Sequence, residues 1–293
     1  MDIQLLLEAI LAGILLGCFY AAVSTGLSIS FGLLDVPHVA HPSMLVAGAY
    51  ATYALAAQGM DPLLAGLALL PLFFLLGLGL YQFYYLTFER RGTDQGLRGI
   101  AFFFGVAFIL QVGLILAFGV DQRLVEADYI GSSTELPEAL GSIRIPNRML
   151  VAFGVALAMT VVLTLYLSRT FTGRAIKAVA QDEGALRLMG ASPVRIKRWA
   201  FGIATATCAL AGALLIIVGP VDPNLDRLYI GRTFCVVVLG GLGSMTGTIV
   251  AGLILGVAES IVLSTAGTAW APAVAFGLLL LVLGVRPAGL FGR

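Results

Sequence analysis

The sequence predicts an all-α, polytopic integral membrane protein with about eight transmembrane helices and two broken or re-entrant segments. Of its 293 residues, 59% are hydrophobic and only 11% are charged, whereas about 25% of the residues of an ordinary soluble domain are charged. Cutting the chain at every Asp, Glu, Lys and Arg leaves eight charge-free stretches of 20 residues or more. Because about 20 apolar residues span a bilayer as a helix, residues 1–293 are expected to form a single transmembrane domain.

The eight stretches predict the transmembrane helices in chain order. Their continuous runs of Leu, Ala, Val and Gly lack the alternation of a membrane β-barrel strand, so helices are expected throughout. The stretches are Ala9–Leu34, Val36–Met60, Pro62–Phe88, Gly99–Val120, Met149–Ser168, Trp199–Val221, Thr233–Ala258 and Ser260–Val285.

The basic residues of the connecting loops predict the orientation, because Lys and Arg are retained on the cytoplasmic side. Residues 169–198 hold seven basic and two acidic residues, which indicates a cytoplasmic loop. Residues 121–148 hold three basic and five acidic residues, which indicates an external loop. By the same rule, Glu89–Arg98 is expected inside and Val221–Arg232 outside.

Two strings of helix-breaking residues interrupt the apolar pattern. The first, residues 31–44, contains two prolines and two histidines, and the second, residues 238–247, is rich in glycine. The similar strings Leu45–Gly48 and Ile249–Gly252 follow them, which indicates an internal repeat, and breaks at matching places in two halves are typical of a substrate path. The path residues predicted by sequence are His38, His41, Ser43, Gly240, Gly241 and Ser244 from the breaks, with Gln111 from the fourth stretch.

These breaks also affect the side of the membrane on which the termini are predicted to lie. If each break adds one short crossing, ten elements result and both termini are cytoplasmic, in agreement with Arg286 and Arg293 in the tail. We therefore expect both termini on the cytoplasmic side.

The cytoplasmic loop is expected to contain one or two short helices outside the bilayer. Thr172 is suited to cap the first helix, Gly190 to close the second, and Ser192 with Pro193 to begin the helix that re-enters the membrane. Two roles are open. The segment either lies on lipid headgroups through its basic residues or docks into a cytoplasmic partner.

Several polar residues allow more than one interpretation. His38 and His41 are interpreted either as a structural pair with satisfied hydrogen bonds or as residues that line the path. Metal binding would need a third ligand, which the spacing does not supply, so no metal site is expected. Gln111 bonds a neighbouring helix or contacts solute. Glu259 is an intramembrane functional candidate by default, but a position near a helix end, in contact with water, is the favoured interpretation. The three cysteines are far apart and are expected to be free thiols.

The cytoplasmic loop resembles the coupling segment of bacterial ATP-binding-cassette (ABC) importer permeases of the branched-chain amino-acid, LivH-like family. The residues that carry the resemblance are Gly173, Arg174, Ala175, Ile176, Lys177, Ala178, Gln181, Asp182, Ala185, Leu188, Met189 and Gly190. Further similarity lies around Gly48-Ala49-Tyr50, Ile109-Leu110-Gln111 and Val236–Ser244.

This resemblance implies a transport subunit in the bacterial cytoplasmic (inner) membrane that carries no cofactor of its own. It implies a second related permease, forming a heterodimer, two cytoplasmic ATPase subunits that use ATP and magnesium, and an external solute-binding protein. It also implies branched-chain or other hydrophobic amino acids as solute. The residues that it assigns to ATPase coupling are Gly173, Arg174, Ala178, Gln181, Asp182, Ala185 and Gly190.

The first break departs from the family pattern of Asn, aromatic, Ala, His, Gly, Glu, because residues 38–43 read His-Val-Ala-His-Pro-Ser. Urea, short amides or another small acid therefore stay open as solute for the same machinery. An ion-coupled secondary transporter would need more membrane carboxylates than Asp35 and Glu259, and no acid–base pair suggests an intramembrane enzyme. The only lysines, Lys177 and Lys197, form no phosphate-binding loop. A net charge of +1 without a basic run excludes a nucleic-acid partner.

Overall fold

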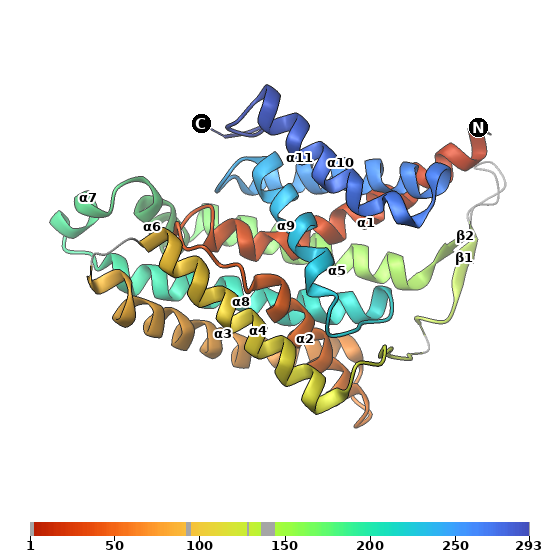
Figure 1. Ribbon diagram of the computed structural model, residues 1–293, viewed down its shortest axis with the longest axis horizontal. Helices are drawn as coiled ribbons and strands as arrows, with labels where there is room; N and C mark the ends of the chain where they lie inside the picture. The colour runs from red at the N-terminus through yellow and green to blue at the C-terminus, as the bar shows by residue number, and fades with distance from the viewer. Residues whose placement is uncertain (1–2, 92–94, 128, 136–143, 293) are drawn as a thin grey trace.

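The protein is a bundle of apolar helices with a short β-hairpin at one end and two surface helices at the other (Figure 1). The computed structural model describes residues 3–91, 95–127, 129–135 and 144–292. The elements of the first half are α1 (Ile3–Ser30), α2 (His41–Ala56), α3 (Pro62–Thr87), η1 (Glu89–Arg91), α4 (Gln95–Phe118), β1 (Ser133–Glu135) and β2 (Arg144–Pro146). Those of the second half are α5 (Asn147–Arg169), α6 (Phe171–Gln181), α7 (Glu183–Leu188), α8 (Pro193–Val218), α9 (Asp226–Gly240), α10 (Met245–Ala266), η3 (Thr268–Trp270) and α11 (Ala271–Val285).

The helices have the length and composition of membrane spans, which confirms the predicted all-α membrane fold. Seven of them in the described part of the chain are long and apolar enough to cross a bilayer. Helices α2 and α9, with 16 and 15 residues, are each only about 23 Å long, shorter than the hydrocarbon core. We call the end of the bundle that carries α6 and α7 the basic end, and the end with β1 and β2 the hairpin end.

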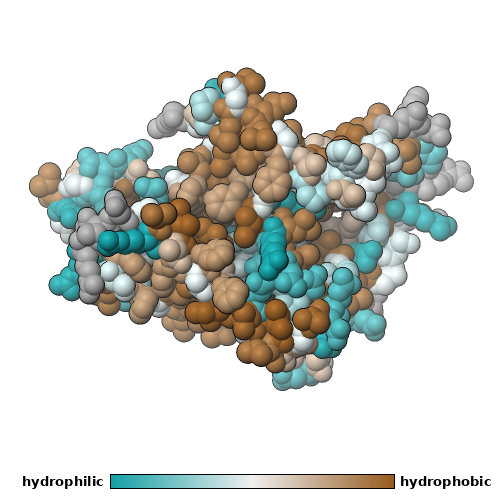
Figure 2. All heavy atoms as spheres, in the orientation of Figure 1, coloured by the Kyte–Doolittle hydropathy of each residue, from teal (hydrophilic) through white to brown (hydrophobic). Residues whose placement is uncertain are grey.

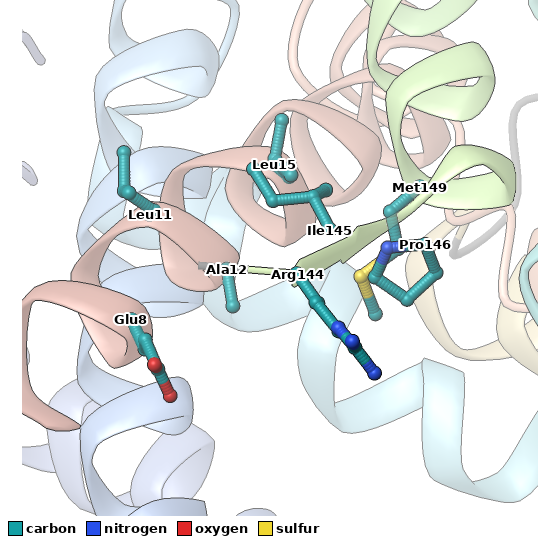
Figure 3. Close-up of a pocket in the computed structure, with 8 residues that line it drawn as sticks. All are labelled: Glu8, Leu11, Ala12, Leu15, Arg144, Ile145, Pro146 and Met149. Carbon is teal, nitrogen blue, oxygen red and sulfur yellow. The ribbon is translucent and has the colours of Figure 1, made fainter. Parts of the chain in front are cut away.

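The two termini lie at opposite ends of the bundle, so the expectation that both are cytoplasmic is wrong (Figure 1). The first turns of α1 lie beside β2 at the hairpin end, where Glu8 and Arg144 line a pocket of about 400 Å³ (Figure 3). The last residues instead lie against the end of α9, because Leu290 N donates to Leu239 O at 2.8 Å.

The error in the termini comes from counting both breaks as extra crossings. Residues 31–40 are non-helical and simply connect the first two apolar stretches, so this break adds no crossing. Residues 241–244 divide the seventh stretch into α9 and α10 and add one. The described chain therefore has nine bundle helices, and an odd number places the ends on opposite sides.

Helix α8 forms the centre of the bundle and is buried along most of its length, against α1, α2, α3 and α5. Helices α1 and α10 pack through glycines spaced four residues apart, Gly13 and Gly17 on α1 with Gly252 and Gly256 on α10. A Cβ added at Gly256 would overlap the backbone of Gly17. Small residues at this spacing let membrane helices approach closely, which explains the glycine that ends the string at 249–252.

Some of the residues predicted to cap the two surface helices do so, and others do not. Thr170, not Thr172, caps α6, since its Oγ1 accepts from Gly173 N at 3.0 Å. Asp182 caps α7 by accepting from Ala185 N at 3.0 Å. Gly190, with φ of +79°, ends the segment as expected, and Pro193 takes the first turn of α8 after Ser192, whose side chain makes no cap bond.

Candidate functional site

The chain re-enters the bundle between α8 and α9. Residues 219–225 are non-helical, and they run beside α2, because Tyr50 Oη donates to Val221 O at 3.3 Å and Ser43 Oγ donates to Asp226 Oδ2 at 2.7 Å. Since Ser43 and Tyr50 lie two turns apart on α2, the segment follows that helix inward, and α9 begins inside the bundle. The prediction of an external loop over Val221–Arg232 is therefore wrong from Asp226 onward, where the chain is helical.

The start of α9 lies at the depth of the membrane interior. Gln111 Nε2 donates to Asn224 Oδ1 at 2.7 Å, and Gln111 is only about 7 Å along α4 from its midpoint. Because the hydrocarbon core extends about 15 Å to each side of the bilayer centre, this contact is well inside it. We call Ser43, Gln111, Asn224 and Asp226 the mid-membrane polar cluster.

Asp226 is the chemically unusual member of this cluster. Asp226 is 5% exposed, and its Oδ1 has no hydrogen-bond partner within the described ranges. No Lys or Arg of the described chain forms an ion pair with it. A buried carboxylate without a cation is costly. The adjacent Arg227 is exposed, and hydrophilic atoms reach the middle of the largely hydrophobic face that α9 crosses (Figure 2).

The two histidines lie in different surroundings at the first break. His38 is fully buried among aromatic rings, 4.5 Å from Phe201 and 5.1 Å from Phe103 between centroids, and neither ring nitrogen has a described partner. His41 Nε2 lies 2.9 Å from Val23 O, and its Nδ1 lies 3.3 Å from Cys208 Sγ. Within the described residues, no three His, Cys, Asp or Glu side chains are grouped to hold a metal ion.

The glycines of the second break lie away from this cluster. Gly240 ends α9, about 21 Å from its first residue, and Gly241, with φ of +93°, packs against Gly292. Ser244 caps α10 by accepting from Gly247 N at 3.1 Å. The two breaks touch directly, since a Cβ at Gly32 would overlap the backbone of Gly243. The structure thus brings Ser43 and Gln111 to one segment and leaves Gly240, Gly241 and Ser244 in a tightly packed region.

The predicted coupling residues lie together on α6 and α7 at the basic end (Figure 1). Helix α6 buries Gly173, Ile176 and Val179 against the bundle and exposes Arg174 and Gln181, while Ala178 is half-buried. Asp182, Ala185 and Gly190 are exposed. The apolar side chains at the end of α7 are also exposed, with Leu188 at 92% and Met189 at 78%.

The surroundings of a second buried charged residue, Glu259, differ from those predicted by sequence. Glu259 is 1% exposed and forms an ion pair with Arg232 of α9, so the expectation that it meets water near a helix end is wrong. The Arg232 guanidinium also lies 5.4 Å from the ring centres of Tyr20 and Tyr229. The partner was missed because the charge-free criterion placed Arg232 in a loop. An Arg on the preceding segment is the signal that could have found it.

Together, a bundle of apolar helices, an interrupted helix that begins inside it and a polar cluster at membrane depth define a polytopic membrane protein of the transport class. The chain matches the sequence profile described as "Branched-chain amino acid transport system / permease component" over residues 9–283. It therefore belongs to that family of ABC transport permeases.

Individual relatives agree with this assignment. The chain is 28% identical to the high-affinity branched-chain amino acid transport system permease protein BraD of Pseudomonas aeruginosa, over 98% of this chain and 96% of BraD. It is 29% identical to LivH of Escherichia coli K12, over 98% and 96% of the two chains. It is also similar to LivM of the same organism, at 35% identity over 49% of this chain and 35% of LivM.

Proposed function

We propose that this chain is the transmembrane subunit of an ABC importer that moves branched-chain or other hydrophobic amino acids inward by alternating access. Separate ATPase subunits would hydrolyse ATP with magnesium, and an external binding protein would deliver the solute to the bacterial inner membrane. The names of BraD and LivH, permeases of high-affinity branched-chain amino acid systems, support a branched-chain amino acid as the solute. The partial similarity to a second named permease, LivM, supports a paired, related subunit.

The observation that carries this proposal is the exposed apolar end of α7. Leu188 and Met189 project from the basic end instead of packing on the bundle, and Ala185 is exposed on the same short helix. Large apolar side chains exposed next to one another mark a binding surface. A groove on an ATPase subunit accounts for this surface, and it accounts for the capped, ordered helices that present it.

Bulk added to α7 tests the docking. We expect Ala185→Trp to abolish stimulation of ATP hydrolysis in the reconstituted complex, because the indole would fill the contact with the ATPase. Gln58→Trp is the matched control, since Gln58 is exposed after α2, away from α6 and α7. Normal ATPase stimulation by Ala185→Trp would show that α7 does not dock.

For the solute, we propose that Asp226 binds the ammonium group. Its free Oδ1 supplies the negative charge that an amino acid recognises and that urea or an amide does not need. Ser43 holds the other carboxylate oxygen, which leaves Oδ1 as the oxygen that is able to accept from the solute. Opening of the bundle in the transport cycle would bring Oδ1 to the path.

Removal of this charge tests the solute assignment. We expect Asp226→Asn to lower leucine uptake about tenfold or more, the effect of losing one charged hydrogen bond, and to leave uptake of 4-methylpentanoate, which lacks the ammonium, unchanged. Asp222→Asn is the control, because Asp222 lies just upstream and its Oδ1 accepts from Asn224 N, a bond that an amide retains. Equal uptake of leucine by wild type and Asp226→Asn contradicts the role. Faster uptake of a neutral amide than of leucine by wild type favours the alternative solutes.

A further inference from the structure

A buried cation joins three elements at the basic end. Lys197, near the start of α8, is 7% exposed; its Nζ donates to Glu89 Oε1 at 2.9 Å and also pairs with Glu183. Glu89 lies in η1, directly after α3, and its Oε2 accepts from Tyr81 Oη at 2.7 Å. Glu183 is the first residue of α7. We call these four residues the Lys197 junction.

The junction attaches a small helix to the bundle. Leu186 is the one residue of α7 that is buried, so α7 has little apolar contact of its own. Among the described residues, α7 forms no ion pair with a transmembrane helix other than that from Glu183 to Lys197. The ion pair therefore ties the first residue of α7 to α8 and, through Glu89, to the segment that follows α3.

Helix α8 connects the junction with the mid-membrane polar cluster. Cys208 lies about 16 Å along α8 from Lys197, and its Sγ is 3.3 Å from His41 Nδ1. Two residues after His41, Ser43 bonds to Asp226. Because α8 is buried along most of its length, a displacement at its first turn is carried to the contacts around Cys208 rather than absorbed by solvent.

We propose that Lys197 is a positioning residue that transmits movement of α6 and α7 to α8 and to the end of α3, and thereby couples ATP hydrolysis to transport. This inference rests on the proposed function. It assigns Lys197 a role distinct from docking: without its ammonium, the ATPase still binds α7, but the movement of α7 no longer reaches α8.

The test uses the complete complex in proteoliposomes, with ATP hydrolysis and leucine uptake measured in the same vesicles. For Lys197→Met we expect hydrolysis close to the wild-type rate and leucine transported per ATP to fall about tenfold, within the range typical of coupling between two sites. Lys197→Arg, which keeps the charge, is expected to restore most of the ratio. Arg198→Met is the matched control, because Arg198 donates to Gln82 of α3 at 3.0 Å and forms no ion pair with α7 among the described residues; its ratio is expected to stay near wild type.

Two results would overturn the inference: an unchanged ratio in Lys197→Met, or hydrolysis and uptake lost in equal proportion. If Lys197→Met does not assemble, Glu183→Gln serves instead, since it leaves the Lys197–Glu89 pair intact, and a normal ratio in that variant is equally decisive. Absence of ATP-dependent uptake by the wild-type complex would instead contradict the proposed function. Normal wild-type uptake with normal coupling in both variants contradicts only the role of Lys197.

Discussion

Two buried cations of the described chain, Arg232 and Lys197, form ion pairs in different surroundings. Arg232 and Glu259 join neighbouring helices α9 and α10 inside the bundle, between tyrosine rings, with Glu259 1% exposed. Lys197 joins Glu89 and Glu183 at the basic end, where the Glu183 side chain is 37% exposed. The side chains of the first pair are almost fully shielded from solvent, whereas Glu183 in the second is partly exposed. The comparison teaches that loss of one partner is expected to cost more stability inside the bundle than at the basic end, where one of the carboxylates is already in contact with solvent.

The largest effect is expected from breaking the interior pair. Arg232→Met leaves Glu259 buried without a cation, which costs about 3–5 kcal/mol when one partner of a buried pair is removed. Thermal unfolding of the purified protein in detergent measures the loss. The double variant Arg232→Met with Glu259→Leu removes both charges and is expected to recover most of the stability. A double variant no more stable than the single one would contradict the explanation.

The next largest effect is expected at the glycine contact between α1 and α10. Gly256→Leu places a side chain against the Gly17 backbone, which cannot move away without separating the helices. We expect a loss of about 3 kcal/mol, at the upper end for overpacking, measured in the same unfolding experiment. Gly277→Leu on α11 is the control, because a Cβ there meets no atom within 4 Å. Equal stability of the two variants would show that the close approach is unimportant.

The smallest effect on stability is expected at the basic end. For Lys197→Met we expect a loss of about 1–2 kcal/mol, less than for Arg232→Met, because Glu183 is 37% exposed and regains water, and the more buried Glu89 keeps its hydrogen bond from Tyr81. Unfolding of both variants under one set of conditions compares the two pairs directly. A loss of stability as large as that of Arg232→Met would show that the two ion-pair sites contribute equally to stability, and would contradict the expected difference between them.

Sequence predicted the helical class, the surface helices and the places of both breaks, because apolar length and helix-breaking residues are local properties. Gly190 as the end of the surface segment and Pro193 at the start of α8 follow from the same local chemistry. The start of α9 could not be predicted, because Asp226 and Arg232 resemble loop charges until their partners on other helices, Ser43 and Glu259, are known.

The candidate site was predicted in part for the same reason. Ser43 was predicted from its place at the first break and Gln111 from its polar side chain in an apolar stretch, and both meet the segment that leads into α9. Asp226, the residue with the free carboxylate oxygen, was not selected, since its own sequence neighbours are polar. Its burial arises only from the way that residues 219–225 fold back beside α2.

The bonds of the last residues to α9 have a consequence for biosynthesis. Leu290 N and Phe291 N donate to the carbonyl oxygens of Leu239 and Gly240, which are among the groups that a helix end leaves without partners. The ribosome has to add α10 and α11 before it reaches these donors. These two carbonyl groups at the end of α9 therefore obtain their partners only after residues 290–291 have been synthesised.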